Sequence, residues 1–232
     1  KKLSWEKEMM DALISQLPSF SQYDQQFFHE VTNCLPFYWK GFDCAVRYTY
    51  VIEDIKIEDL EKNFETDIRR RRRRKADNDG VKIYESDDIE KFYELNQKTF
   101  DRQNIDISYS FDFVKNLFDS CKAHNAVKMY FAKIDDEVIA ANFLGYDDNT
   151  VYYLMGGIEP TKKDLGGMDV VQFESIKFAL ENKKRFDFEG SMMESIEKYF
   201  RSFGAVQKPY FHITKTNSKI LKLKKVIKEI LT

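Results

Sequence analysis

The sequence has 232 residues, of which 43% are hydrophobic and 33% charged, the composition of an ordinary globular protein with room for one large domain or two small ones. Its formal net charge of -2 excludes an overall field that would draw the chain to nucleic acid or to a membrane, so any such interaction needs a local patch. No apolar run approaches the length of a membrane span, and no integral membrane segment is predicted.

The cysteines and histidines argue against disulfides and against a metal. Cys34, Cys44 and Cys121 make an odd count without a Cys-x-x-Cys pair, which favours reduced thiols and a cytoplasmic location. The three histidines are far apart in the sequence, and no pair has the spacing of metal ligands. We therefore predict a cytoplasmic protein that holds no metal.

Residues 1–56 contain too few predicted elements to close a core of their own. Periodic apolar residues predict a helix over Trp5–Leu17, and a second helix is predicted over Gln22–Val31. Val46–Ile55 is rich in β-branched residues and tyrosine, which predicts a strand. One strand and two helices make about half a domain, so the other half lies upstream or comes from the rest of the chain.

Residues 57–80 are predicted to form a linking helix that contains six consecutive arginines, Arg69–Arg74. Six successive helical residues cover the whole circumference, so some of these arginines must face protein. Acidic residues precede the run and are numerous enough to pair with much of it. The alternative is a binding site for phosphate groups on a substrate or nucleic acid, with Arg69, Arg70 and Arg73 as its contacts. The sequence leaves both interpretations open. Asn78-Asp79-Gly80 predicts a turn and a domain boundary.

From residue 81 the order of the predicted elements becomes regular. Strands are predicted over Val81–Glu85, Val127–Ile134, Val138–Tyr146, Thr150–Gly157, Arg185–Glu189 and Ala205–Lys215, and helices over Asp87–Phe100, Tyr109–His124, Met168–Asn182 and Ser191–Phe203. The resulting order is β, α, α, β, β, β, α, β, α, β. It is not the alternating pattern of a dinucleotide-binding fold.

Local signals mark the segments around the last two strands. In Arg185–Glu189 the alternation places Phe186 and Phe188 on one face and Asp187 and Glu189 on the other. Ser191 stands three residues before Glu194, the spacing of a capping box at a helix start, and Gly204 is placed where a helix ends in a left-handed residue. A buried strand thus carries two carboxylates toward one side.

The tail, residues 216–232, is predicted to form a basic amphipathic helix. Apolar residues such as Ile220 and Leu223 alternate with lysines at helical spacing. Such a helix usually packs its apolar face on its own protein. Peripheral contact with an anionic membrane is the alternative.

The element order from residue 81 to residue 215 resembles the GNAT (N-acetyltransferase) superfamily. The resemblance implies an α+β fold with a mostly antiparallel, mixed sheet and helices on both faces. It further implies that Thr150–Gly157 and Arg185–Glu189 splay apart, and that an acyl-CoA donor lies between them. The expected contacts of that donor are Met155, Gly156 and the loop residues Lys163, Gly166, Gly167 and Met168. The pyrophosphate would bind at the start of the following helix, where free N–H groups favour anions.

Three phrases extend the resemblance to the Fem-like branch of the superfamily, which comprises bacterial acyltransferases related to the peptidyl transferases of peptidoglycan synthesis. They are Phe186–Met192, Tyr199–Ala205 and Pro209–Phe211. Members carry two such domains in tandem, so residues 1–56 are expected to be the C-terminal part of a first GNAT-like domain and residues 81–215 the second. Aminoacyl-tRNA is the alternative donor, but Asp87–His124 has no room for the long helical arm of the tRNA-dependent enzymes.

The resemblance and the residues together define the predicted chemistry. Glu189 and Asp187 are candidates for accepting a proton from the incoming amine; for Asp187, bonding to the backbone of the next helix is an equal alternative. In many superfamily members, a tyrosine at the position of Phe200 donates a proton to the leaving thiolate. Here the neighbouring Tyr199 is the candidate for that role. Tyr153, Lys208 and Tyr210 are candidates for contacting the acceptor.

The predicted function is an N-acyltransferase that modifies an amine on a cell-envelope polysaccharide or a peptidoglycan precursor. The acceptor is thus a small molecule, glycan or peptide, and tRNA is a less favoured partner. A catalytically degenerate module that binds phosphorylated glycan, lipid or nucleic acid through the arginine run is the alternative. Met168 and Phe200 depart from the superfamily pattern and favour that alternative, whereas the two carboxylates of Arg185–Glu189 favour an enzyme.

Overall fold

The computed structural model describes residues 1–77 and 80–231, without the side chains of residues 72–77, 225, 226 and 228–231. The chain forms two compact units, one of Lys1–Thr49 with Lys208–Thr232 and one of Tyr50–Gln207. The chain passes between the two units at Thr49/Tyr50 and at Gln207/Lys208. The domain boundary predicted at Asn78-Asp79-Gly80 includes residues outside the described ranges and stays a prediction. No helix in the described ranges is long and apolar enough to cross a membrane.

The first unit surrounds a small aromatic core. Its elements are α1 (Lys2–Ser15), β1 (Gln22–Gln26), α2 (Leu35–Trp39), most of β2 (Asp43–Ile52), most of β8 (Val206–Thr216) and α8 (Lys219–Leu231). β8 pairs with β1 on one side and is bonded to β2 on the other. Phe37 and Phe42 are buried in the core, and their rings meet edge to face with centroids 5.2 Å apart.

The helix predicted over Gln22–Val31 is wrong, because Gln22–Gln26 is a strand. β1 runs antiparallel to β8, from the pair Gln22↔Thr216 to the pair Gln26↔His212. Tyr23 is the β1 residue that packs against the aromatic core, with its ring 5.2 Å from that of Phe42. Pairing with a strand some 190 positions away therefore overrides the local preference.

The second unit is built on a sheet with the order β2-β7-β6-β5-β4-β3. Its strands are the end of β2, β3 (Lys82–Glu85), β4 (Val127–Ile134), β5 (Glu137–Tyr146), β6 (Thr150–Ile158) and β7 (Arg185–Asp187). Its helices are η1 (Ile57–Asn63), α3 (Thr66–Asp77), α4 (Ile89–Arg102), α5 (Phe111–Ala123), η2 (Pro160–Leu165), α6 (Gly167–Glu181) and α7 (Glu194–Arg201). All neighbouring strands are antiparallel except β6 and β7, which are parallel. The predicted mixed, mostly antiparallel sheet is confirmed.

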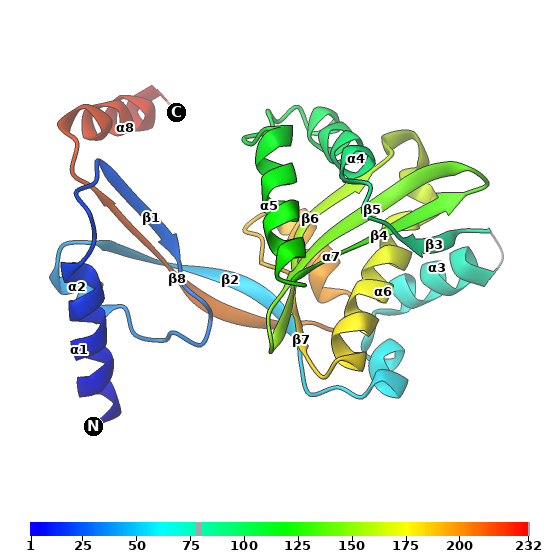
Figure 1. The fold of residues 1–232 in the computed structure, drawn as a ribbon, viewed down its shortest axis with the longest axis horizontal. Coiled ribbons are helices and arrows are strands. Elements are labelled where there is room, and N and C mark those ends of the chain that lie inside the picture. The colour runs from blue at the N-terminus through cyan, green and yellow to red at the C-terminus, as the bar shows by residue number, and fades with distance from the viewer. Residues whose placement is uncertain (78–79, 232) are drawn as a thin grey trace. The chain divides into compact units, whose positions relative to one another are not determined.

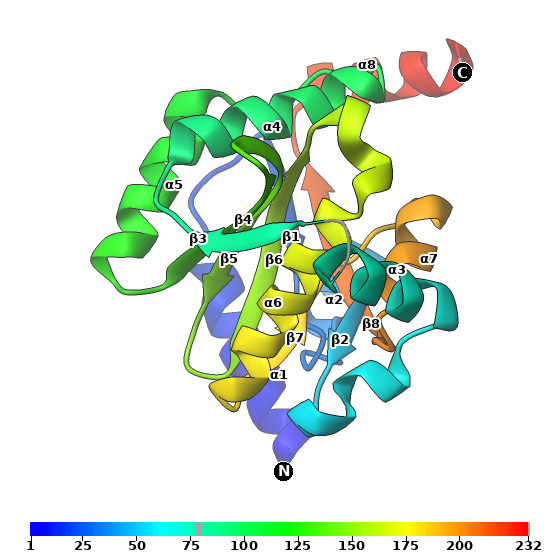
Figure 2. The same cartoon turned by 90° about the vertical axis from the view of Figure 1, so that its right-hand side faces the viewer.

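Helices cover both faces of this sheet, with α4 and α5 on one face and α6 on the other, and α3 packs against α6 (Figures 1 and 2). The alternation along β4 explains the two layers, because successive side chains point to opposite faces. Met129 and Phe131 belong to the cluster under α4 and α5, whereas Tyr130 and Ala132 pack with residues of α6. Both sets are apolar, as expected for a strand covered on both sides.

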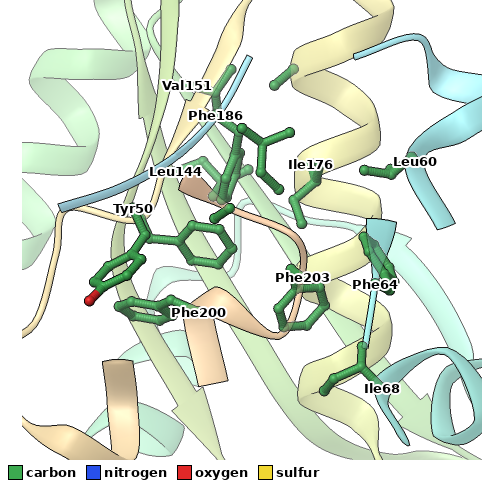
Figure 3. Close-up of a cluster of buried hydrophobic side chains, with 14 residues drawn as sticks. Tyr50, Leu60, Phe64, Ile68, Leu144, Val151, Ile176, Phe186, Phe200 and Phe203 are labelled. Carbon is green, nitrogen blue, oxygen red and sulfur yellow. The ribbon is translucent and has the colours of Figure 1, made fainter. Parts of the chain in front are cut away.

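The largest core cluster lies where β2, β6, β7 and α7 meet α6 (Figure 3). Phe186 and Phe188 are 0% and 1% exposed, with ring centroids 5.0 Å apart, which confirms that both phenylalanines of the β7 segment point into the core. Phe200 and Phe203 complete the cluster from the end of α7. The chain segment that carries the two predicted carboxylates is thus firmly anchored.

Two local predictions are wrong. The linking helix predicted over residues 57–80 is divided into η1 and α3, because Phe64 is extended and buried and the Glu65 N–H donates to the Ser202 carbonyl at 2.8 Å. The capping box at Ser191 does not form, since α7 begins at Glu194 and the Ser191 hydroxyl accepts from the Met193 N–H at 3.0 Å. The left-handed residue expected at Gly204 is present, with φ at 76°.

Candidate functional site

Strands β6 and β7 separate soon after they begin to pair. Their parallel pairing consists of Thr150↔Arg185, Val151↔Phe186 and Tyr152↔Asp187. β6 then continues to Ile158, while β7 ends at Asp187. The register between β5 and β6 shifts at this place and leaves Leu154 outside the pairing, a bulge that bends the strand. Beyond Tyr152, no strand in the described part of the chain pairs with β6 on the β7 side.

A cavity of about 750 Å³ occupies the space between the diverging segments. α4, the free half of β6, the start of α6, the loop after β7, and α7 form its walls. Those walls include Asn96, Tyr153, Met155, Gly156, Met168, Glu189 and Tyr199. A volume of this size suits a ligand of cofactor dimensions.

The wall formed by α4 and β6 is held by side-chain bonds to the strand backbone. The Asn96 amide donates to the Gly156 carbonyl at 2.7 Å, and the Tyr109 hydroxyl donates to the Asn96 carbonyl oxygen at 2.9 Å. The Thr99 hydroxyl accepts from the Ile158 N–H at 3.0 Å. These side chains occupy part of the strand edge that β7 leaves unpaired, and they fix the distance between helix and strand. These side chains are not among the predicted site residues, although a polar Asn96 on the buried face of α4 is a signal in the sequence.

Glu189 lies on the cavity wall in an unusual backbone conformation. Its φ is 58°, a region in which a residue other than glycine is uncommon and worth explaining. The buried Asp187 carboxylate accepts from the Glu189 N–H at 2.9 Å and stabilises this turn. Asp187 therefore bonds to the backbone directly after its own strand.

The environment of Glu189 favours the protonated form of its carboxyl group. Desolvation by the surrounding walls, followed by repulsion from Asp187, raises the pKa of Glu189 to about 7. The side chain is nonetheless exposed, because the cavity is open to solvent. A carboxylate with a pKa near neutrality can take and release protons at physiological pH.

Tyr199 reaches the opposite wall and forms a hydrogen-bonded chain with two charged residues. Its hydroxyl donates to one oxygen of Asp169 at 3.0 Å, and the other oxygen accepts from the Arg71 guanidinium at 2.9 Å. Burial, with the charge of Asp169 next, raises the pKa of Tyr199 well above its usual value. These hydrogen bonds join α3, α6 and α7. Arg71 is a member of the arginine run Arg69–Arg74.

Removing Arg71 from the hydrogen-bonded series Tyr199–Asp169–Arg71 is expected to destabilise the protein. Asp169 is only 5% exposed, so Arg71→Ala leaves a desolvated carboxylate whose other partner, among the side chains that the structure describes, is Tyr199. Because Arg71 itself is half exposed, we expect about 2 kcal/mol, less than for a fully buried pair. Urea unfolding of Arg71→Ala, Tyr199→Phe and the double variant measures the coupling. If the two losses of unfolding free energy simply add in the double variant, Arg71 and Tyr199 are not coupled through Asp169.

Tyr153 points its hydroxyl along the cavity wall toward the backbone of Gly156. A Cβ placed on Gly156 would lie 2.0 Å from this hydroxyl and 3.4 Å from the Met168 methyl group. The Tyr153 ring meets that of Phe200 edge to face, with centroids 6.0 Å apart. Burial raises the pKa of Tyr153, so its hydroxyl stays protonated at neutral pH. The Tyr153 hydroxyl can therefore occupy this position only because residue 156 is a glycine.

Some of the residues predicted to bind the acyl donor lie on the cavity wall. Met155, Gly156 and Met168 line it, whereas Lys163, Gly166 and Gly167 lie on the adjoining loop and helix start. Gly166 has φ at 70°, and no side chain of the described residues caps α6 there. The N–H groups of the first turn of α6 are therefore available to an anion.

The remaining predicted residues lie elsewhere. Arg69 and Arg70 are on α3, and the side chain of Arg73 lies outside the described residues. Lys208 and Tyr210 are on β8 in the first unit, where the Tyr210 hydroxyl donates to Gln26 at 2.9 Å. Within the described part of the chain, no group of three histidine, cysteine, aspartate or glutamate residues is arranged to hold a metal ion.

Comparisons with known proteins place this arrangement in a family. A family model described as an acetyltransferase (GNAT) domain matches residues 62–201. No curated protein matches the chain. Among solved structures, FemX has a TM-score of 0.71 and 13% identity, with 88% of this chain and 76% of FemX covered.

Two further structures share the fold. L-PGS from Bacillus licheniformis has a TM-score of 0.56 and 11% identity over 87% of this chain and 70% of that one. The C-terminal domain of a putative lysylphosphatidylglycerol synthetase from Agrobacterium fabrum has a TM-score of 0.55 and 11% identity, over 79% of this chain and 65% of that one. The predicted Fem-like fold is confirmed by the FemX likeness. With the family model matching more than half of its length, the chain belongs to the acetyltransferase (GNAT) family and is an acyltransferase.

Proposed function

We propose that the chain is an N-acyltransferase that moves an acyl group from acyl-CoA to an amine in the cavity between β6 and β7. The observation that carries the proposal is the joint occurrence of this cavity and of Glu189, whose pKa of about 7 suits a proton acceptor at neutral pH. General-base catalysis of this kind contributes about 100-fold to 10,000-fold in rate.

The cavity has features that fit a CoA thioester. Its lining combines apolar side chains, such as Met155 and Met168, with few charged groups, which suits the pantetheine arm. The uncapped first turn of α6 offers N–H groups and the positive end of the helix dipole to the pyrophosphate. Lys163 stands three residues before Gly166 and adds a positive charge to the same loop.

In the proposed reaction Glu189 accepts a proton from the ammonium form of the acceptor. The neutral amine then attacks the thioester carbonyl, the new C–N bond forms, and the C–S bond breaks to release a thiolate. A tyrosine hydroxyl protonates this thiolate, and the proton that the nitrogen loses as it becomes an amide restores that hydroxyl.

Three tyrosines line the cavity, and they differ as sources of the proton for that thiolate. The Tyr109 hydroxyl donates to the side-chain oxygen of Asn96. The Tyr199 hydroxyl donates to Asp169, whereas the Tyr153 hydroxyl lies beside Gly156 on the cavity wall. We therefore assign the acid role to Tyr153 and a positioning role to Tyr199.

The acceptor that we propose is an amine on a cell-envelope polysaccharide or a peptidoglycan precursor. The resemblance of Phe186–Met192, Tyr199–Ala205 and Pro209–Phe211 to the Fem-like branch supports an envelope substrate, and FemX shares the fold. Aminoacyl-tRNA remains the alternative donor, and α4 and α5, at 14 and 13 residues, are ordinary helices rather than a long arm. The cysteines are free thiols, which fits a reducing cytoplasm as the place of the reaction.

Binding of acetyl-CoA and of CoA to the purified chain tests the donor. A ligand that binds only the folded state raises the melting temperature by mass action, and calorimetry then gives the stoichiometry. Gly166→Asp is expected to abolish the shift, because it adds a negative charge at the predicted pyrophosphate site. Gly41→Asp is a matched control, since Gly41 has φ at 77°, lies in the first unit, and suffers the same backbone strain.

The outcomes separate the alternatives. Saturable binding that Gly166→Asp removes and Gly41→Asp keeps would support the donor loop. Failure of both CoA species to bind would reject the CoA-dependent reaction and favour aminoacyl-tRNA or a binding module that uses the arginines of α3. Equal loss in the two variants would show that the strain, not the charge, is responsible.

A further inference from the structure

Helix α8 exposes a continuous apolar stripe. Ile220, Leu223 and Ile227 are 69%, 61% and 48% exposed. Their spacing of three and four residues places them on one side of the helix, about 60° apart or less at 100° per residue. Single exposed apolar residues are normal on a protein surface, whereas an aligned set points to a partner.

The described residues of the first unit do not cover this stripe. Within that unit, no other described helix or strand packs extensively against α8, whereas α1 packs on α2. Figure 1 shows α8 following the end of β8 as a separate arm of its unit. A helix of 13 residues is marginal in water when nothing packs on it. The helical form of α8 therefore depends on a surface that receives the apolar stripe.

The charges of α8 indicate which surface this is. Its sequence from Lys219 to Leu231 contains five lysines and one glutamate. Lys219, Lys222 and Lys224 are exposed and lie on both flanks of the stripe, since helical geometry puts Lys224 on one side and Lys219 on the other. Long lysine side chains at such positions let the apolar face sink into a membrane while their ammonium groups reach the headgroups.

We propose that α8 is an interfacial helix that binds a membrane surface rich in anionic lipid, lying in the plane of the headgroups with its stripe of Ile220, Leu223 and Ile227 facing the acyl chains. The exposed apolar stripe supplies the hydrophobic part of the binding. The flanking lysines supply the electrostatic part, which selects anionic over zwitterionic headgroups and weakens as salt is added. This membrane contact does not depend on the identity of the acyl donor.

Vesicle flotation with the purified chain tests the proposal. Vesicles of equal parts phosphatidylglycerol and phosphatidylcholine are expected to carry the protein, and vesicles of phosphatidylcholine alone are not. The change Ile220→Ser/Leu223→Ser/Ile227→Ser is expected to abolish binding. Lys219→Gln/Lys222→Gln/Lys224→Gln is expected to weaken it by about 100-fold, from roughly fivefold per lysine.

A matched control comes from α1. Leu3 and Leu13 are exposed to a similar degree, at 70% and 61%, on a helix that contains acidic residues. Leu3→Ser/Leu13→Ser is expected to leave vesicle binding unchanged, and all variants are expected to keep the melting temperature of the original chain, because every altered side chain is exposed.

Three results would overturn the proposal. The first is failure of the original chain to bind the anionic vesicles. The second is loss of binding in the α1 variant as large as in the α8 variant, which would mean non-specific adhesion. The third is a dimer in solution that the α8 serine variant converts to a monomer, which would mean that the stripe receives a second copy of the chain.

Discussion

Glu189→Gln is expected to lower the rate of acyl transfer by at least about 100-fold at pH 8. Glutamine keeps the size of the side chain and its place on the cavity wall, but it cannot accept a proton from the acceptor ammonium. In the original protein, kcat/KM is expected to rise with pH up to about 7, the pKa of Glu189, and then to level off because the carboxylate form is complete. The variant should lack this limb of the profile.

The same substitution has a consequence that needs no acceptor. The folded-state pKa of Glu189 is raised from its usual value of 4.5 to about 7, so the folded protein holds this proton more tightly than the unfolded chain does. Folding stability therefore falls as pH rises through this window and stays lower above it. Glu189→Gln removes the ionisation, so its melting temperature should exceed that of the original protein at pH 8 and match it at pH 4.

Glu194→Gln is the control for both measurements. Glu194 is an exposed glutamate at the start of α7 that is not part of the cavity wall. Its replacement should change neither the pH profile of activity nor the difference in melting temperature between pH 4 and pH 8. If Glu189→Gln behaves like Glu194→Gln in both respects, Glu189 is not the base and its pKa is not raised.

Gly157→Ala is expected to cost about 3 kcal/mol of folding stability, the upper part of the range for overpacking a core. A Cβ at this position would lie 2.7 Å from the Asn96 backbone nitrogen and 2.7 Å from the Leu95 Cβ. Backbone atoms of α4 cannot turn aside, so the helix must move away from β6. The bond from Asn96 to the Gly156 carbonyl, 2.7 Å long, should weaken with that movement, and CoA binding should weaken with it.

Gly145→Ala on the neighbouring strand β5 is the comparison. Its Cβ would approach the Leu154 Cδ1 at 2.9 Å, but that atom is the end of a flexible side chain and can rotate. The expected cost is below about 1.5 kcal/mol. Urea unfolding of both variants gives the two values, and equal destabilisation would mean that the close approach of α4 to β6 does not limit the position.

Much of the second unit was predictable because its signals are local. The alternation around Phe186 and Phe188, the composition of the strands β4, β5 and β6, and the glycine at position 204 each depend on neighbours in sequence. The order of elements that follows from them was sufficient for the fold. β1 escaped prediction because its partner β8 is distant in the sequence, and the break at Phe64 escaped because it depends on a bond to Ser202.

The candidate site was predictable only in part, for the same reason. The alternation in the predicted strand Arg185–Glu189 indicates Glu189, yet β7 ends at Asp187. The left-handed backbone and raised pKa of Glu189 come from the turn that Asp187 stabilises and from the cavity walls. The bond between Arg71 and Asp169 spans 98 positions. No periodicity or motif indicates which arginine of a run of six finds such a partner.

The bond from Arg71 to Asp169 also imposes a thermodynamic linkage between two segments. Asp169 belongs to the first turn of α6, where the proposed donor phosphates bind, and Arg71 belongs to the arginine-rich α3. An anion that competes with Asp169 for Arg71 would release the carboxylate beside that turn and change the affinity for the donor. Reciprocity then requires the donor to change the affinity of α3 for the anion by the same factor. A polyanionic acceptor and the acyl donor would thus each change the affinity of the protein for the other through one ion pair.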